Sequence, residues 1–156
     1  MEIAELIAPS RVISRARCSS KKRLLEYVSV AFSRSVPGLT RDGVFETLIR
    51  RERLGSTAVG HGAAIPHGRT AETDRILGLF LRLEDGVDFD APDQEHVDLV
   101  FAVLLPEKAQ AEHREVLNHL ARMFRDPRFC RDLRAAPRAQ DLHFMLDDWQ
   151  PAGVGT

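Results

Sequence analysis

Two almost uninterrupted apolar stretches constrain the fold more than any other feature of this sequence. Residues 76–81 read Ile-Leu-Gly-Leu-Phe-Leu, and residues 97–105 read Val-Asp-Leu-Val-Phe-Ala-Val-Leu-Leu. A strand with one face in water alternates apolar and polar residues, whereas a strand covered on both faces is apolar almost throughout. Both stretches are therefore expected to be strands of a sheet with helices on its two faces, and Pro106 closes the second.

Helical periodicity returns on either side of these strands. Thr40 is a good N-cap residue, and either Ser19 or Ser20 can cap an earlier helix. Asp126-Pro127 separates two later helices because proline is tolerated in the first turn of a helix. The expected helical ranges are 20–33, 40–53, 107–124, a short segment after Pro127, and 139–146.

Three further segments complete the expected pattern. Residues 11–14 and 57–65 are predicted strands, and residues 87–90 are either a short edge strand or a loop. Helices before, between and after apolar strands indicate an α/β domain with a central mixed β-sheet flanked by helices on both faces. We expect a single domain over residues 1–156, with its core from about 6 to 146 and a loose tail at 149–156.

Composition excludes several classes of protein. The net charge of -1 gives no general attraction to nucleic acid or to an anionic membrane. Cys18 and Cys130 lie far apart in the sequence, which argues against a disulfide framework or a structural zinc site and fits a reducing compartment. No apolar run approaches the roughly 20 residues of a membrane helix, and the N-terminus lacks the pattern of a signal peptide. We expect a cytoplasmic protein with no nucleic-acid partner and no membrane insertion.

Pro66-His67-Gly68 is the stretch that makes chemistry plausible. Pro66 fixes its own φ and restrains the residue before it, so the chain reaches His67 in a stiff, extended form. Gly68 has no Cβ, and we expect the chain to turn sharply there and leave room for a bulky group. A lone histidine in a loop is usually only a polar residue, but this setting suits a presented nucleophile.

His113 is the best candidate for a second functional histidine. It lies three residues before Val116 and four before Leu117, so it shares the apolar stripe of its predicted helix. His119 is six residues further on, about 240° around the helix, and points elsewhere. The N-terminal end of a helix favours the neutral imidazole, because the dipole there opposes protonation.

The other histidines give weaker signals. His96 and His143 are expected at the surface, whereas His61 either joins His67 at the site or faces solvent. A zinc hydrolase site made of His61, His67 and His113 is an alternative, because three histidines can hold a catalytic zinc. However, no helix sets the spacing of His61 and His67, and no carboxylate is clearly placed to support the ligands. We expect no metal and no cofactor.

Phosphoryl transfer fits these residues better than hydrolysis does. The sequence has neither a Gly-x-Ser-x-Gly elbow nor a phosphate-binding P-loop. An imidazole nitrogen is a competent nucleophile at neutral pH and also a good leaving group, so it can relay a phosphoryl group reversibly. Arg51, near the end of the second predicted helix, has the guanidinium fork that stabilises phosphoryl oxygens.

The motifs around these residues resemble a known family, the fructose/mannitol-type enzyme IIA domains of the bacterial phosphotransferase system. The resemblance rests first on residues 51–57, Arg-Glu-Arg-Leu-Gly-Ser-Thr, and on Gly60-x-Gly62-x-Ala64-Ile65-Pro66-His67-Gly68, where x marks a position outside the match. It continues in Phe89-Asp90-Ala91-x-Asp93, residues 97–101, Leu105-Pro106 and the His113 helix. The resemblance runs from about residue 6 to about 146 and is greatest for the nitrogen-regulatory IIA proteins.

This resemblance implies a mechanism and a partner. His67 would accept a phosphoryl group from a histidine-containing phosphocarrier protein (HPr-like), His113 would be the second active-site histidine, and Arg51 would help to hold the group. Thr57, Gly68 and His61 are candidate neighbours of the site. The protein would then be a phosphotransferase whose phosphorylation state regulates targets that the sequence does not identify.

Three positions depart from the usual family pattern, and three alternatives stay open. His61 stands where asparagine is common in the nitrogen type, Ala63 replaces a usual isoleucine, and Arg114 replaces a common apolar residue after His113. In the same chemistry, the chain could be the IIA component of a fructose/mannitol-type sugar permease. From other classes, it could be a binding module that is never phosphorylated, or the zinc hydrolase considered above.

Overall fold

The two apolar stretches form adjacent antiparallel strands at the centre of the sheet. A computed structural model describes residues 3–108 and 110–151, and in it these strands are β5 (Leu77–Val87) and β6 (Val97–Pro106). Phe80 of β5 packs into a core on one face of the sheet, whereas Leu79 and Leu81 pack into a second core on the other face. The prediction that both stretches are strands covered on both faces is confirmed.

The sheet is mixed, as predicted. β1 (Val12–Ala16) pairs in parallel with β5, and β3 (Ala63–Ala64) and β4 (His67–Thr70) pair in parallel with β6. β2 (Ala58–Gly60) is antiparallel to β3. The strand order is therefore β1-β5-β6-β3-β2, with β4 also on β6.

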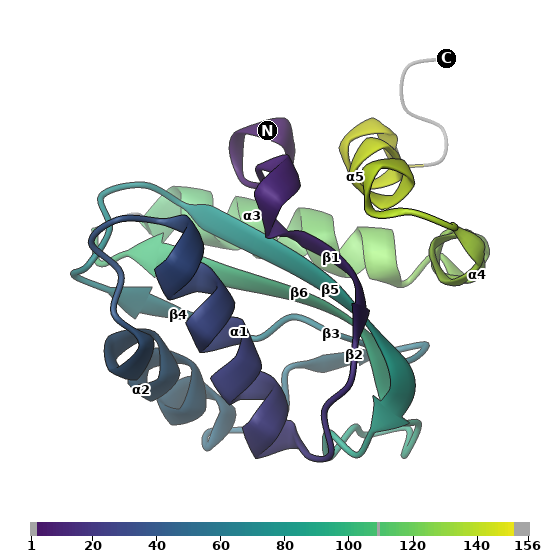
Figure 1. Cartoon of the computed structure of the whole chain (residues 1–156), viewed down its shortest axis with the longest axis horizontal. Helices are drawn as coiled ribbons and strands as arrows, with labels where there is room; N and C mark the ends of the chain where they lie inside the picture. Colours follow the sequence, from purple (N-terminus) through teal and green to yellow (C-terminus); the bar gives the residue numbers. More distant parts are fainter. Residues whose placement is uncertain (1–2, 109, 152–156) are drawn as a thin grey trace.

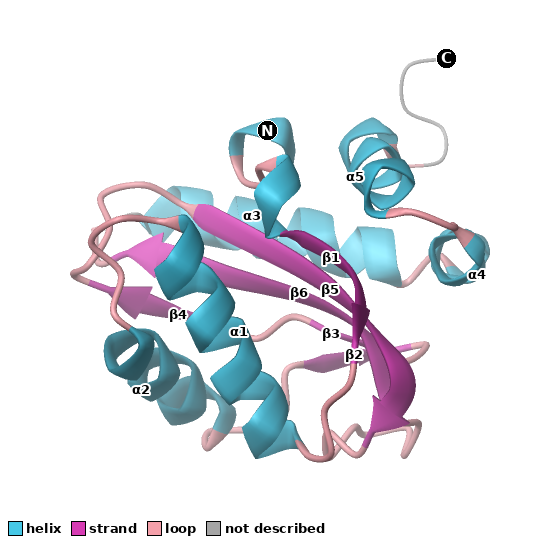
Figure 2. Cartoon of the chain, viewed as in Figure 1, coloured by secondary structure: helices cyan, strands magenta, loops and turns pink. Residues whose placement is uncertain are grey.

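Helices cover both faces of this sheet (Figures 1 and 2). α1 (Lys21–Ser35) and α2 (Arg41–Glu52) lie on one face. α3 (Gln110–Phe124), α4 (Pro127–Ala135) and α5 (Ala139–Asp148) lie on the other, together with the N-terminal 3-10 turn η1 (Ile3–Glu5). A second 3-10 turn, η2 (Pro9–Arg11), leads into β1. Within the described part of the chain, no helix has the length and apolar character needed to span a membrane.

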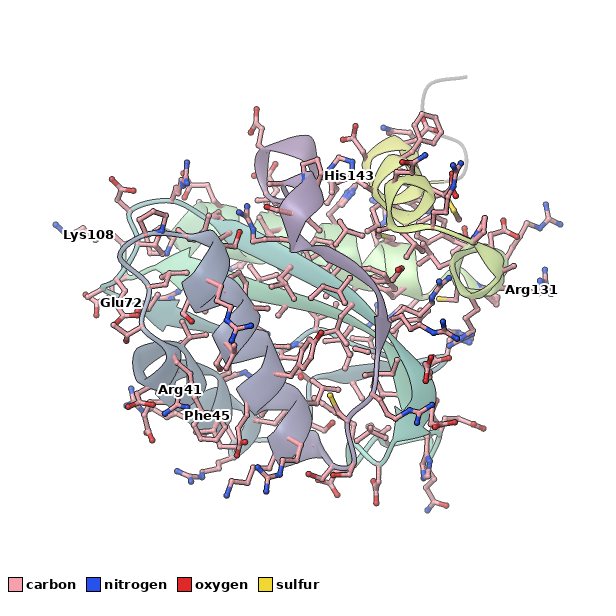
Figure 3. The ribbon with its side chains drawn as sticks, viewed as in Figure 1. Arg41, Phe45, Glu72, Lys108, Arg131 and His143 are labelled. Atoms are coloured by element: carbon pink, nitrogen blue, oxygen red, sulfur yellow. The ribbon has the colours of Figure 1, made fainter. Side chains whose placement is uncertain are left out.

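The predicted N-cap residues lie at the starts of α1 and α2. Ser20 accepts a hydrogen bond from the Arg23 amide at the start of α1, and Thr40 does the same for the Gly43 amide of α2. The Thr40 hydroxyl also donates to Glu72, which lies in the turn after β4 at the edge of the sheet (Figure 3). The N-terminus of α2 is thereby tied to the strand that carries His67.

One predicted strand is instead a hairpin. Residues 57–65 contain β2 and β3, which are joined by a tight turn at His61 and Gly62 with φ of 55° and 74°. The carbonyl of His61 accepts a hydrogen bond from Arg134, and a Cβ at Gly62 would lie 2.5 Å from the same guanidinium. The positive φ favours glycine at position 62, and a side chain there would also displace the Arg134 guanidinium. The single-strand prediction missed this reversal.

Gly68 does not turn the chain, contrary to our expectation. It is buried within β4, and a Cβ there would lie 2.5 Å from the Thr47 methyl carbon and 2.9 Å from the Thr47 carbonyl oxygen. Glycine at this position lets α2 approach the strand closely. Residues 88–90 are a loop that follows β5.

Two expectations near the C-terminus were also wrong. Trp149, placed in a loose tail, packs against the core beneath α4 and α5, and its indole donates to Asp126 over 3.3 Å. Residues 152–156 of that tail lie outside the described residues. His143, expected at the surface, is half-buried, and its ring lies 3.1 Å from the Ile7 carbonyl of the N-terminal segment (Figure 3). Packing against the N-terminal segment covers His143, and packing against α3 and α4 covers Trp149.

The close approach at Gly68 gives a stability prediction. We expect Gly68→Ala to lower the free energy of unfolding by about 1–3 kcal/mol, because the added methyl group overpacks the contact with Thr47. Urea unfolding followed by circular dichroism measures this change. The double variant with Thr47→Ser removes one of the two close neighbours and should recover part of the loss. An unchanged urea midpoint in the single variant would contradict the packing described here.

Candidate functional site

β4 holds His67 rigidly at the edge of the parallel ladder with β6. His67 pairs with Val103, and the Val103 amide donates to the Pro66 carbonyl over 2.8 Å. The Ile65 amide donates to the Thr57 carbonyl over 3.0 Å, so the approach to His67 is also fixed. The half-buried imidazole is therefore presented by backbone that is hydrogen-bonded on both sides of Pro66.

A short hydrogen bond decides which nitrogen of His67 is nucleophilic. Nδ1 lies 2.8 Å from the Ile65 carbonyl oxygen. A carbonyl oxygen only accepts, so Nδ1 carries the proton and Nε2 keeps its lone pair. Burial lowers the pKa of His67, the charge of Arg51 adds to this effect, and the Ile65 hydrogen bond and the Glu52 carboxylate oppose it. The neutral ring with a free Nε2 is the state that can attack phosphorus.

His113 faces His67 from the N-terminal part of α3. Their ring centroids are 5.9 Å apart and the ring planes meet at 78°. Burial lowers the pKa of His113, and the charges of Arg69, Arg114 and Arg51 lower it further. His113 therefore enters the site as a neutral imidazole, as its place near the helix N-terminus predicts.

Arg51 lies beside His67 at the end of α2. Together with His67 it lines two adjoining hollows, one bounded by α3 and the other by Leu54, Arg69 and His113. Its Nη1 donates to the Gly55 carbonyl over 2.9 Å. The structure thus brings together His67, His113 and Arg51 from three separate elements, in the combination that the sequence indicated.

Glu52 anchors the end of α2, and sequence reasoning missed it. Its buried carboxylate accepts from the Thr57 amide over 2.9 Å and from the Thr57 hydroxyl over 2.6 Å. Lys21 of α1 completes the cluster with a 2.8 Å ion pair. Thr57, a predicted neighbour of the site, lines a hollow with His67 while its hydroxyl is held by Glu52. This cluster positions Arg51, the residue next to Glu52.

The role of Arg69 was also not predicted from the sequence. Its Nε and Nη2 lie 3.1 and 3.0 Å from Nδ1 of His113. The strand period of two places Arg69 on the same face of β4 as His67, and this alternation is the signal that could have found it.

His61 is not part of this group. It is exposed in the turn between β2 and β3, where it lines a separate hollow with Asp93, His96 and Asp98. His96 is exposed, as predicted. Among residues 3–108 and 110–151, no cluster of three or more histidine, cysteine, aspartate or glutamate side chains could hold a metal ion. The zinc arrangement of His61, His67 and His113 therefore does not form.

The sequence matches a family described as the phosphoenolpyruvate-dependent sugar phosphotransferase system, EIIA 2, over residues 5–149. A nitrogen regulatory protein of Bradyrhizobium diazoefficiens is 41% identical over 146 residues, which are 94% of this chain and 95% of the relative. The nitrogen regulatory protein of Pseudomonas aeruginosa is 39% identical over 151 residues, 96% of this chain and 97% of that relative.

Solved structures agree with this match. The nitrogen regulatory protein IIA-Ntr of Neisseria meningitidis has a TM-score of 0.88 and 40% identity, and the match covers 92% of this chain and 98% of the other. IIA mannitol of Escherichia coli has a TM-score of 0.74 at 18% identity, over 90% of this chain and 98% of the other, which shows a shared fold. The chain therefore belongs to the EIIA 2 family of the phosphoenolpyruvate-dependent phosphotransferase system, and it is similar to the nitrogen regulatory proteins in that family.

Proposed function

We propose that this protein is a phosphoryl carrier and regulator of the nitrogen-type phosphotransferase system. It accepts a phosphoryl group on Nε2 of His67 from a histidine-containing phosphocarrier protein, and it regulates its targets through its phosphorylation state. The observation that carries this proposal is the hydrogen bond from Nδ1 of His67 to the Ile65 carbonyl, which leaves Nε2 unprotonated beside His113 and Arg51.

The transfer needs no proton to move at His67. The Nε2 lone pair attacks the phosphorus carried by the donor's imidazole, and a new N–P bond forms as the donor's N–P bond breaks. The donor nitrogen keeps the electron pair of the broken bond. The His67 ring gains positive charge while its Nδ1–H stays bonded to the Ile65 carbonyl, which stabilises that charge. The reverse step returns the ring to its neutral state.

Arg51 and His113 supply donors for the phosphoryl oxygens. Among the described residues, the guanidinium of Arg51 makes one hydrogen bond, from Nη1 to the Gly55 carbonyl, which steadies it and leaves its other N–H groups for the oxygens. The neutral His113 ring adds a donor from the opposite side. Such donors stabilise charge that is spread over the oxygens in a loose phosphoryl-transfer transition state.

The surface around the site suits docking of a carrier. Leu54 is 82% exposed and lines the same hollow as His67. Exposed Arg50 lines the same hollow and exposed Arg53 precedes Leu54 in the chain, so this surface combines an exposed apolar side chain with positive charge. A dianionic phosphoryl group on His67 changes the charge of this surface, and a target can distinguish the two states without any change of shape.

A role in regulation is favoured over a role in sugar import. The IIA component of a sugar permease would use the same nucleophile and the same arginine. However, the identity is 39–41% to nitrogen regulatory proteins that match over nearly the whole chain, against 35% over about half of the chain (53%) to a fructose-specific EIIA component and 18% to IIA mannitol.

The first test is phosphorylation itself. When the protein is incubated with phosphoenolpyruvate, enzyme I and a phosphocarrier, we expect a single acid-labile phosphoryl adduct in the mass spectrum. His67→Ala should abolish the adduct, because it removes the nitrogen that the Ile65 hydrogen bond leaves free for attack. His61→Ala is the matched control, since this histidine lies in a separate hollow, and it should be phosphorylated normally. An adduct that persists in His67→Ala would move the site elsewhere.

The second test separates His113 from the nucleophile. We expect His113→Ala to form the adduct, but about 10- to 100-fold more slowly, because one donor to the phosphoryl oxygens is lost. Rapid-quench kinetics in both directions, from the carrier to the protein and back, measures this effect. Unchanged rates in both directions would contradict the role of His113.

The third test concerns the protonation of His67. Burial and nearby positive charge disfavour the imidazolium, so the pKa of His67 lies below the usual value of about 6.5 and its ring is neutral to a greater extent than a free imidazole at the same pH. A proton NMR titration should give a lower midpoint for His67 than for histidines in the urea-unfolded chain. Arg51→Met removes one of the charges and should raise the midpoint. A folded-state midpoint at or above the unfolded value would refute this electrostatic description.

A further inference from the structure

Arg69 makes a directed contact with one nitrogen of His113. Its Nε and Nη2 lie 3.1 and 3.0 Å from Nδ1, so the edge of the guanidinium is aimed at a single atom. β4 holds Arg69 opposite Leu105 of β6, two residues after His67 in the same ladder. His67 and the arginine that contacts His113 are thus fixed on the same strand.

The chemistry of this contact determines the tautomer of His113. A guanidinium has only donors and stays charged at any ordinary pH, so Nδ1 of His113 must present its lone pair. The proton of the neutral ring then resides on Nε2. In the absence of Arg69, no other group among the described residues is placed to hold Nδ1 of His113, and the ring is free to exchange between its two neutral tautomers.

We propose that Arg69 is a positioning residue for phosphoryl transfer, which holds His113 in the tautomer and orientation whose Nε2–H donates to the phosphoryl group on His67. This inference rests on the proposed function. Arg69 differs from Arg51 in its role: Arg51 donates to the phosphoryl oxygens directly, whereas Arg69 acts through His113.

The surrounding charges support a neutral donor at this position. Arg69 on β4, Arg114 on α3 and Arg51 on α2 all oppose protonation of His113, in addition to its burial, and His67 faces it from β4. A protonated His113 would pair with the phosphoryl dianion as an ion and hold it more tightly. A neutral N–H stabilises the group while letting it depart, as a reversible relay requires.

Nitrogen-15 NMR of the unphosphorylated protein tests the contact directly. In the wild type, Nδ1 of His113 should resonate as an unprotonated nitrogen and Nε2 as a protonated one. Arg69→Met should move both signals toward intermediate, exchange-averaged positions. Arg114→Met is the matched control, because it removes a neighbouring charge but no hydrogen bond to the ring, and it should keep the wild-type signals. Unchanged signals in Arg69→Met would overturn the proposal.

A double-mutant cycle tests the functional role. Arg69→Met should slow phosphoryl transfer about 3- to 10-fold, the equivalent of one ordinary hydrogen bond, and Arg69→Lys should recover part of the rate. In the His113→Ala background, Arg69→Met should cause no further loss. An equal loss in that background would mean that Arg69 contacts the phosphoryl group itself, which would overturn the positioning role.

The two proposals can fail separately. If the wild type gave no adduct with any phosphocarrier, the proposed function would be refuted while the NMR signals still reported whether Arg69 fixes His113. If the wild type were phosphorylated and the cycle were additive, the proposed function would stand and the role of Arg69 would be refuted.

Discussion

The parallel pairing of β4 with β6 is the constraint on which the rest of the site depends. It fixes the main chain at His67 and at Arg69, and the bond from Val103 to the Pro66 carbonyl fixes the approach. Because side chains alternate along a strand, this ladder directs His67 and Arg69 to one face and Gly68 to the other. One face receives α3 with His113, and the other receives α2, whose last turn carries Arg51. A short strand thereby sets the relative positions of groups that are distant in sequence.

Much of the fold was predictable because local patterns and burial agree in this chain. The two-sided burial of β5 and β6 explains their continuous apolar character, and caps such as Thr40 act locally, so both could be identified from sequence. The hairpin at His61-Gly62 was missed because its reversal depends on positive φ at a non-glycine residue. Trp149 and His143 were misplaced because their partners lie on segments that are distant in sequence.

The same distinction between local and long-range signals applies to the residues of the site. His67, His113 and Arg51 could be proposed because each has a local signal: a proline before it, an apolar helical stripe, or a helix end. The carboxylate of Glu52 and the guanidinium of Arg69 could not, because their roles depend on side-chain directions that only the assembled layers define. The residues proposed to perform the chemistry were therefore easier to find than the residues that orient them.

The packing of Trp149 has a practical consequence. It is the sole tryptophan of the chain, and its indole lies edge-on to His119 of α3 and against Phe129 of α4. The helix that it touches through His119 also carries His113. The protein consequently contains an intrinsic fluorophore in contact with the helix that carries His113, and its emission reports on the environment of α3 without any added label.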